Sequence, residues 1–290
     1  MLKRYLSITK PGIIFGNLIS VAAGFFLAAK TEPASAMLLL TTLAGVGLVI
    51  ASGCVVNNIF DRDIDQKMKR TQNRELVQGN INTDVAFVYA LVLLLSGTAL
   101  LFQFANPISA VMVLLGYVFY VFFYTMWYKR TSVYGTLVGS ISGAVPPLVG
   151  YLAVTNYISL EAVLLFVMFC LWQMPHSYAI AMFRLQDYRD AGIPVLPVKE
   201  GVDKAHQHMK AYVVAFGAVS LALFLLGEAG YEYLAVSAAV CFMWTKVTFR
   251  KVDCLNYIQW SKTVFKVSLL VVMSISGVLG LELIPLPTLF

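Results

Sequence analysis

Residues 85–128 read VAFVYALVLLLSGTALLFQFANPISAVMVLLGYVFYVFFYTMWY, a stretch of 44 residues without a charged side chain. A membrane-spanning helix needs about 20 mostly apolar residues, so this stretch is long enough for two such helices. Asn106-Pro107 lies at its centre, and proline neither continues a helix nor favours helical geometry in the residue before it. The stretch therefore predicts two transmembrane helices that fold back on each other at Asn106-Pro107.

The composition of the whole chain supports a membrane protein. Of its 290 residues, 59% are hydrophobic and only 12% are charged, against roughly 25% charged residues in soluble domains. This balance excludes a soluble globule, a disordered chain and a secreted disulfide scaffold. We predict an all-α integral membrane protein with a single domain over residues 1–290 and a bundle of nine transmembrane helices, at about 12–29, 37–58, 85–105, 108–128, 134–154, 160–182, 211–227, 230–249 and 264–284.

The distribution of positive charge predicts the orientation of this bundle. With nine spans, 20 of the 21 lysines and arginines fall on the side of the N-terminus, and only Lys30 falls on the other side. Cytoplasmic loops carry the excess of lysine and arginine, so we expect a cytoplasmic N-terminus and a periplasmic C-terminus in a bacterial inner membrane. The net charge of +6 is then explained by membrane topology, and we expect a lipid bilayer and no nucleic acid as partner.

The densest polar group lies at the cytoplasmic end of the second span. Asn57, Asp61 and Asp65 are spaced by four residues, so on a helix they form one stripe, and Asp63 points away from it. Oxygen ligands on one stripe suit Mg²⁺, which takes one or two carboxylates together with phosphate oxygens. A solvated helix end with ordinary loop charges is the alternative. Basic residues that suit the remaining oxygens of a phosphorylated ligand follow directly: Lys69, Arg70 and Arg74.

A second polar group spans residues 172–190. His176 lies within an apolar span directly after a proline, where it is either a satisfied packing residue or a functional one. In the loop that follows, Asp187 and Asp190 share a helix face with Arg184, and a surface ion-pair ladder explains them equally well. The sequence alone leaves both choices open.

Tyrosines recur every four residues at the end of the fourth predicted span. Tyr120, Tyr124 and Tyr128 precede Lys129-Arg130. An aromatic belt at the membrane interface explains this pattern, and a role near a reacting centre is the alternative.

Taken together, these motifs resemble the UbiA superfamily of intramembrane prenyltransferases, and in their finer pattern they resemble the branch that farnesylates heme. The resemblance covers nearly the whole chain from Lys3 to Lys204 and is weak over the last three helices. It is carried by the stripe and its basic neighbours, and by the segments Thr9-Lys10-Pro11-Gly12-Ile13, Ala51-Ser52-Gly53-Cys54, Tyr134-Gly135-Thr136, Gly143 to Tyr151, Trp172-Gln173-Met174-Pro175-His176, Asp187-Tyr188 and Ile193 to Val198.

The resemblance implies a reaction and a set of residue roles. A helical bundle whose active site opens to the cytoplasm would transfer the farnesyl group of farnesyl diphosphate to a vinyl group of heme b, with addition of water, to give heme O. Heme b is then a substrate, and Mg²⁺ is the cofactor. The implied catalytic residues are Asn57, Asp61, Asp65 and Asp187, of which the first three bind the metal. The implied contacts to diphosphate are Lys69, Arg70, Arg74, Lys129, Arg130 and Arg184. Tyr124 and Trp172 are implied contacts to the farnesyl cation, and His176 is an implied contact to heme.

One departure from the superfamily pattern limits this transfer of roles. Many members carry a fuller DxxxD in the second loop, whereas this chain has Gln186-Asp187-x2-Asp190, so a symmetric scheme with two magnesium ions is not expected. A related prenyltransferase that acts on an aromatic quinone precursor is the alternative activity. A transporter is disfavoured because the charges crowd one face and leave the spans free of charge. Handover of heme O to a terminal oxidase or to heme A synthase stays open.

Overall fold

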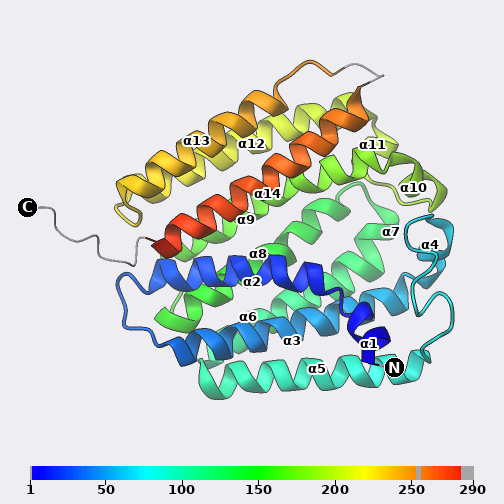
Figure 1. Cartoon of the computed structure of the whole chain (residues 1–290), viewed down its shortest axis with the longest axis horizontal. Coiled ribbons are helices and arrows are strands. Elements are labelled where there is room, and N and C mark those ends of the chain that lie inside the picture. Colours follow the sequence, from blue (N-terminus) through cyan, green and yellow to red (C-terminus); the bar gives the residue numbers. More distant parts are fainter. Residues whose placement is uncertain (1, 253–255, 282–290) are drawn as a thin grey trace, which may run out of the picture.

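The computed structural model describes residues 2–252 and 256–281, and within these ranges the chain is helical without a strand. Its longer helices run alongside one another (Figure 1). They are α2 (Pro11–Ala28), α3 (Ala36–Phe60), α5 (Thr83–Phe104), α6 (Pro107–Val118), the π-helix η1 (Phe119–Tyr128), α8 (Gly135–Thr155), α9 (Leu160–Phe183), α12 (Val202–Leu225), α13 (Tyr231–Thr248) and α14 (Tyr257–Leu281); the short ones are α1 (Leu2–Ile8), α4 (Arg62–Lys67), α7 (Lys129–Thr131), α10 (Leu185–Asp190) and α11 (Leu196–Lys199).

Eight helices in the described ranges are long and apolar enough to cross a membrane. One of them is the continuous rod formed by α6, η1 and α7, over Pro107–Thr131. The helix α13 matches the eighth predicted span in position but falls outside this set of eight. The structure therefore describes an all-helical multi-pass membrane protein.

The turn between α5 and α6 lies where the sequence predicts it. α5 ends at Phe104 and α6 begins at Pro107. Asn106 caps α6, because its Oδ1 accepts from the backbone N–H of Ser109 at 2.8 Å. Its Nδ2 donates to the carbonyl of Leu152 at 2.8 Å, which ties the turn to the end of α8.

Two of the later helices are longer at their N-terminal ends than the sequence analysis expects. α12 begins at Val202 rather than near 211, and α14 begins at Tyr257 rather than near 264. The first two turns of α12 are amphipathic, because Ala205 and Met209 are buried whereas Lys204 is exposed. Charged residues on the exposed face interrupt the charge-free stretch, so the sequence places the start of this helix too late. The last three residues of the predicted span 264–284 lie outside the described residues.

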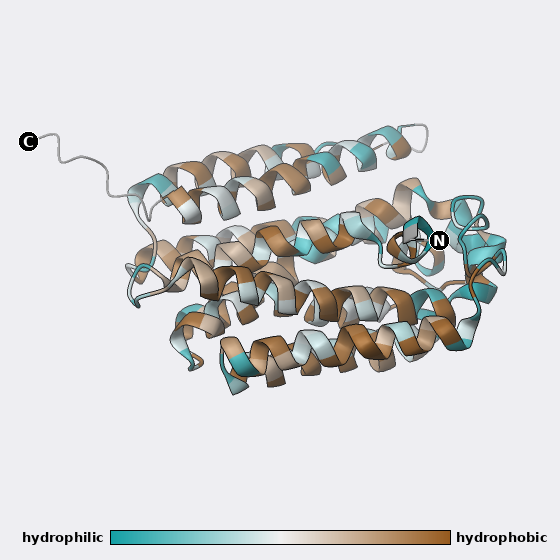
Figure 2. Ribbon diagram, turned by 60° about the horizontal axis from the view of Figure 1, so that its bottom comes forward, coloured by the Kyte–Doolittle hydropathy of each residue, from teal (hydrophilic) through white to brown (hydrophobic). Residues whose placement is uncertain are grey.

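Polar residues gather at one end of the bundle. The hydropathy colouring shows hydrophilic loops and short helices at the end that carries α1, α4 and α10, while the long helices are mainly apolar (Figures 1 and 2). The exposed apolar side chains on the outer helices, such as Phe87 and Leu95 on α5, are those expected to face lipid. The candidate site lies at the polar end.

Helices α2 and α8 pack with their backbones in direct contact. A Cβ on Gly24 would lie 1.9 Å from the carbonyl oxygen of Pro147, and a Cβ on Gly150 would lie 2.0 Å from that of Val21. Lipid offers no hydrophobic drive for helix association, so close packing of small residues stabilises such contacts in membranes. Only glycine fits at these two positions.

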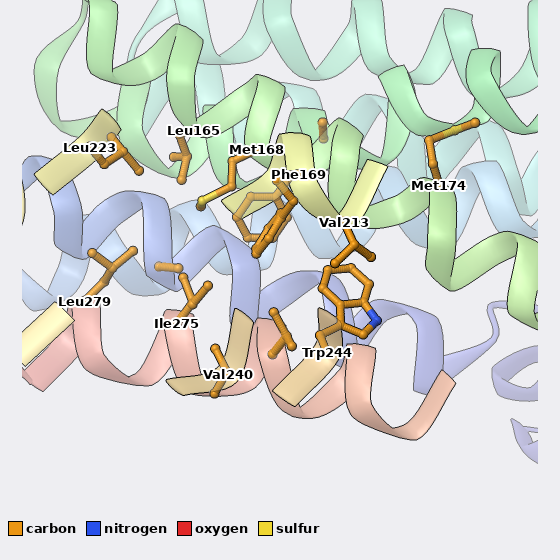
Figure 3. Packing of buried hydrophobic residues seen from close by; sticks show 14 of the residues in the cluster. Leu165, Met168, Phe169, Met174, Val213, Leu223, Val240, Trp244, Ile275 and Leu279 are labelled. Atoms are coloured by element: carbon orange, nitrogen blue, oxygen red, sulfur yellow. The ribbon is translucent and has the colours of Figure 1, made fainter. Parts of the chain in front are cut away.

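Helices α9, α12, α13 and α14 share a large apolar core (Figure 3). Trp244 is fully buried, and its ring meets Phe216 edge to face at a centroid distance of 5.4 Å. Met168 and Phe169 of α9 lie against the same cluster. This packing holds α9, which carries several of the candidate site residues, in a fixed position.

Candidate active site

The stripe of Asn57, Asp61 and Asp65 continues without interruption from α3 into α4. The backbone N–H of Asp61 donates to the carbonyl of Asn57 at 2.9 Å, and that of Asp65 donates to Asp61 at 2.7 Å. The four-residue helical spacing is therefore kept, although Asp61 itself separates the two helices. All three residues are at most 4% exposed, whereas the side chain of Asp63 is 62% exposed. The stripe faces the protein interior, and Asp63 faces away from it.

Both carboxylates of the stripe are paired with cations from outside it. Lys129, at the end of η1, donates to Oδ2 of Asp61. Arg74 donates to Oδ2 of Asp65 at 2.5 Å. Buried charges without such partners are strongly unfavourable. The two pairs therefore join the polar end of α3 to η1 and to the loop after α4.

The amide of Asn57 is also held at both ends, by residues that the sequence analysis does not place in the site. Lys10 donates to its Oδ1 at 2.5 Å, and its Nδ2 donates to Asp61 at 2.8 Å and to the buried hydroxyl of Thr125 at 3.1 Å. Lys10 has a left-handed backbone with φ of 56°, directly before Pro11. In the sequence, Lys10 stands out through its position before a proline at the start of the first span and through the segment Thr9-Lys10-Pro11-Gly12-Ile13 of the resemblance, but neither signal gives it a role.

Burial, together with the nearby charges of Arg74 and Lys129, lowers the pKa of Lys10 to about 8. Several cations thus converge beside one amide and two carboxylates. An excess of positive charge at a buried site favours an anionic ligand.

The oxygen set fits a hard divalent cation. Oδ1 of Asp61 is buried and has no hydrogen-bond partner, and NH2 of Arg130 lies 3.7 Å from it. A buried carboxylate oxygen without a partner is unfavourable, and a metal ion would satisfy it. Carboxylate and amide oxygens together with phosphate are the ligands that Mg²⁺ prefers. Asp61, Asp65 and Asn57 are therefore suited to hold Mg²⁺.

Arg130 is engaged by Asp63 at the surface. Its NH1 and NH2 atoms each donate to a carboxylate oxygen of Asp63 at 2.9 Å, and its NH2 also donates to the carbonyl of Phe60 at 2.5 Å. These hydrogen bonds lower the pKa of Asp63 to about 2. The structure thus places Arg130 at the rim of the site rather than on the stripe.

The two acidic loops, which four predicted helices separate in the sequence, meet in the structure. Ile64 and Met68 of the first loop pack on Ala191 and Ile193 of the second. The packing of the helices thus brings together two loops that lie far apart in the sequence.

Guanidinium groups from both loops converge at this junction. Burial lowers the pKa of Arg70, and the like charges of Arg184 and Arg74 lower it further. Lys69 and Arg70 are both exposed, so the burial that acts on the Arg70 guanidinium is partial. The junction presents positive charge from both loops toward the end of the stripe.

Asp187 lies in the second loop but makes its ion pair locally. Arg184 NH1 is 3.8 Å from Asp187 Oδ2, and the Asp187 side chain is 21% exposed. The next residue, Tyr188, faces inward and lines the cavity described below, and burial raises its pKa. In the sequence, Tyr188 belongs to the Asp187-Tyr188 segment of the resemblance, but nothing there assigns it a role in the site.

A cavity of about 330 Å³ lies in the membrane-embedded part of the protein, and Lys129, which binds Asp61 of the stripe, forms part of its wall. Its polar end is lined by Lys129, Tyr124 and Tyr188, and Cys54 lies one turn before Asn57 on α3. The volume lies at the lower end of the roughly 300 to 1,000 Å³ that small-molecule sites occupy. Its deeper walls are mainly apolar: Val46, Val49, Ile50, Val113 and Val145.

The π-helical segment η1 shapes this cavity. Tyr120 and Tyr124 both line it and stack on each other at a centroid distance of 5.8 Å. The ammonium group of Lys129 lies 5.9 Å from the centre of the Tyr124 ring, within the range of a cation–π contact. π-helical turns occur mainly at functional sites. The tyrosine pattern therefore serves the cavity and not only a membrane-interface belt.

Trp172 and His176 point toward α14 and do not line the cavity. The two rings stack at 4.7 Å, and His176 also lies 4.9 Å from the ring of Phe265. Ser268 of α14 binds both residues: its carbonyl accepts from Trp172 Nε1 at 2.7 Å, and its hydroxyl is 2.8 Å from His176 Nδ1. Gln173 and Ser177, which alternate with them on α9, are the residues that face the cavity.

Comparisons with known proteins agree with this architecture. The model of the UbiA prenyltransferase family matches residues 17–270. Protoheme IX farnesyltransferase 1 of Vibrio campbellii is 90% identical over 287 residues, which cover 99% of both chains. A solved structure of digeranylgeranylglyceryl phosphate synthase superposes with a TM-score of 0.79 at 21% identity and covers 96% of this chain and 98% of its own. A UbiA homologue from Archaeoglobus fulgidus, bound to GPP and Mg²⁺, superposes with a TM-score of 0.71 at 16% identity and covers 95% and 100%.

Proposed function

The chain belongs to the UbiA prenyltransferase family, and on this premise we propose that it transfers the farnesyl group of farnesyl diphosphate to a vinyl group of heme b, with addition of water, to give heme O and diphosphate. The relative in Vibrio campbellii that bears the name protoheme IX farnesyltransferase supports this substrate pair. The observation that carries the proposal is a buried stripe of oxygen ligands, surrounded by cations, at the polar end of an apolar cavity.

The diphosphate lies at the polar end. Lys10, Arg74 and Lys129 are the buried or half-buried cations that contact the stripe, and Arg70 and Arg184 add charge from the two loops. Asp61, Asp65 and Asn57 hold Mg²⁺, in keeping with the archaeal family member that was solved with GPP and Mg²⁺. Bound Mg²⁺ neutralises charge on the diphosphate and so assists its departure. Lys69 and Arg130 act at the rim, where they attract the anion, and Asp187 orients Arg184.

The farnesyl chain occupies the apolar cavity. Departure of diphosphate leaves an allylic cation, and the faces of Tyr120 and Tyr124 line the part of the cavity closest to Lys129. Aromatic faces attract cations, so these rings stabilise the farnesyl cation while the apolar walls exclude bulk water. The terminal vinyl carbon of heme then forms the new carbon–carbon bond.

Heme contact is proposed for the aromatic surface between α9 and α14. Trp172, His176 and Phe265 stack there, and a porphyrin ring binds well to such aromatic faces. Because Nδ1 of His176 is held by Ser268, Nε2 is the ring nitrogen with which His176 would contact heme. The product, heme O, leaves through the membrane to a terminal oxidase or to heme A synthase.

We place the polar end in the cytoplasm of a bacterial cell and the bundle in the inner membrane, with α13 as a ninth span. The asymmetric distribution of lysine and arginine supports this orientation, and so does the gathering of the polar loops at one end (Figure 2). The active site then opens to the compartment that supplies farnesyl diphosphate. The N-terminus is cytoplasmic, and the C-terminal end, whose last residues lie outside the described ranges, is periplasmic.

The test is mass analysis of heme extracted from membranes that contain this protein. We expect heme with a gain of one farnesyl group and one water, and none from membranes that contain Asp61→Ala. Chelation of divalent cations should stop the reaction, and added Mg²⁺ should restore it. Unchanged heme from verified folded protein, together with prenylation of 4-hydroxybenzoate, would instead assign the activity to a quinone precursor.

A further inference from the structure

We propose that Gln173, with Ser177 and the proline-freed carbonyl groups of α8, binds and orients the water molecule that is added to heme. This inference rests on the proposed function. That reaction requires one water at a defined carbon, inside a cavity that otherwise excludes water. None of the catalytic roles assigned above supplies such a position.

The amide of Gln173 is fixed at one end. Its surroundings assign Nε2 to the side of the backbone carbonyls of Gly139 and Ser140, to which it then donates at 3.2 Å each. The opposite orientation would face the amide oxygen toward those acceptors, so the hydrogen bonds assign Oε1 to the other side. Gln173 lines the cavity. Oε1 is then the amide atom that lies against Gly143, another residue of the cavity wall, and it is a fixed acceptor at that point of the wall.

The helix α8 makes room for this amide. A Cβ on Gly143 would lie within 2.5 Å of the three terminal atoms of Gln173. Any larger residue at position 143 would displace the amide from the wall. A long polar side chain inserted beside a glycine, at membrane depth, indicates a functional requirement.

Two prolines supply further acceptors at the same place. Pro146 and Pro147 lie inside α8 and have no backbone N–H. The carbonyls of Ser142 and Gly143, one turn earlier, therefore lack their usual helical donors, and both residues line the cavity. Ser177, four residues after Gln173 on the same face of α9, adds a hydroxyl. A buried water typically needs two to four polar partners, and this wall provides them.

The position suits the reaction. The ring of Tyr124 lies 3.1 Å from the Cβ position of Gly139, whose carbonyl accepts from Gln173. The same ring faces the ammonium group of Lys129, which binds Asp61. Through Gly139, Gln173 is therefore placed close to Tyr124, whose ring lines the diphosphate end of the cavity. The carbon that water attacks is two bonds from the farnesyl carbon that the diphosphate leaves, so the water must lie close to that end.

The chemistry balances without a side-chain base. The C–O bond of farnesyl diphosphate breaks, the terminal vinyl carbon bonds to the farnesyl carbon, and the inner vinyl carbon becomes a cation. Acceptors such as Gln173 Oε1 hold the hydrogens of the water, so its lone pair faces this cation and forms the C–O bond. The proton that is released goes to the departing diphosphate, which has gained a negative charge. If water is absent, the cation loses a neighbouring proton instead and yields an alkene.

This competition gives a direct test. Heme products of Gln173→Leu and Ser177→Ala are analysed by mass, with Gln259→Leu, an exposed glutamine of α14, as the matched control. We expect both site variants to form farnesylated heme that is lighter by one water, with the hydrated fraction reduced at least tenfold for Gln173→Leu. Gln259→Leu should give the hydrated product alone.

Each other outcome has a distinct meaning. Wild-type proportions of hydrated product in both site variants would overturn the assignment. If Gln173→Leu does not fold, Ser177→Ala decides by the same ratio. Loss of all product from folded Ser177→Ala would also contradict it, because a water-binding residue is not needed for the carbon–carbon bond. Absence of farnesylated heme from the wild type would instead reject the proposed function.

Discussion

The ammonium group of Lys129 donates a hydrogen bond to Oδ2 of Asp61, 68 residues earlier in the chain. The contact closes the polar end of the cavity, because Lys129 lines the cavity and Asp61 lies on the buried stripe. It also brings the π-helical segment against the end of α3.

Replacing Asp61 with asparagine should reduce heme farnesylation at least about 100-fold, the loss typical for removal of a key charge-stabilising group. Asp63→Asn is the matched control, because Asp63 lies two residues away but binds Arg130 at the surface. We expect Asp63→Asn to keep most activity. Rates are measured as farnesylated heme formed by purified protein of verified fold. Equal loss in both variants would contradict the stripe.

The pH dependence of farnesyl diphosphate use should report Lys10. Its pKa is lowered to about 8 in the folded protein, so its charge is present below about pH 8 and lost above. Since kcat/KM follows ionisation of the free enzyme, we expect kcat/KM for farnesyl diphosphate to fall above about pH 8. Lys10→Arg keeps its charge throughout this range and should give a flatter profile. A profile unchanged by this substitution would remove Lys10 from the diphosphate site.

The same group predicts how stability changes with pH. The folded pKa of Lys10 lies below the ordinary 10.5, so the unfolded chain binds more protons between these two values. Stability contributed by Lys10 therefore rises as pH increases from about 8 to 10.5. Thermal unfolding of detergent-solubilised protein should show this rise, and Lys10→Met, which cannot ionise, should lack it. A parallel response of the two proteins would contradict the lowered pKa.

Gly24→Ala should destabilise the bundle. Its Cβ would lie 1.9 Å from a backbone oxygen of α8, and a clash with backbone cannot be relieved by a rotamer change. Overpacking of this kind costs about 1 to 3 kcal/mol or more. Gly217→Ala on α12 is the control, since no atom lies within 4 Å of its Cβ position. It should leave stability unchanged or raise it by up to about 1 kcal/mol, as measured by thermal unfolding.

Substitution of His176 by leucine should raise the KM for heme while the KM for farnesyl diphosphate stays constant. Ser268→Ala separates packing from heme contact, because it removes the hydroxyl that binds His176 Nδ1 and leaves the imidazole in place. We expect Ser268→Ala to lower the unfolding temperature with a smaller effect on heme KM. If both variants change only the unfolding temperature, His176 serves α9–α14 packing alone.

The sequence predicts those parts of the fold and site that depend on local periodicity. Charge-free length locates the spans, Asn106-Pro107 locates a turn, and four-residue spacing places Asn57, Asp61 and Asp65 on one buried stripe. These features depend only on residues within one or two helical turns.

Contacts between distant helices could not be predicted in this way. Lys10 and Thr125 reach Asn57 from 47 and 68 residues away, and their positions follow from how three helices pack. The helix that His176 contacts could not be predicted for the same reason. Neither Pro175 nor the apolar composition of the span indicates which neighbouring helix packs against it. The placement of the amphipathic start of α12 likewise depends on its tertiary partners.

Because Lys129 pairs with Asp61 and Arg74 pairs with Asp65, the buried charges at the polar end balance one another within the protein. Each of the two carboxylates is bound to a cation, and each of these cations can exchange that carboxylate for a phosphate oxygen. Substrate entry is then an exchange of partners rather than the creation of new buried charge. The net charge buried at the polar end then changes little during the catalytic cycle. A cavity without a large unpaired charge attracts few ions, and this limits ion leakage through a protein embedded in lipid.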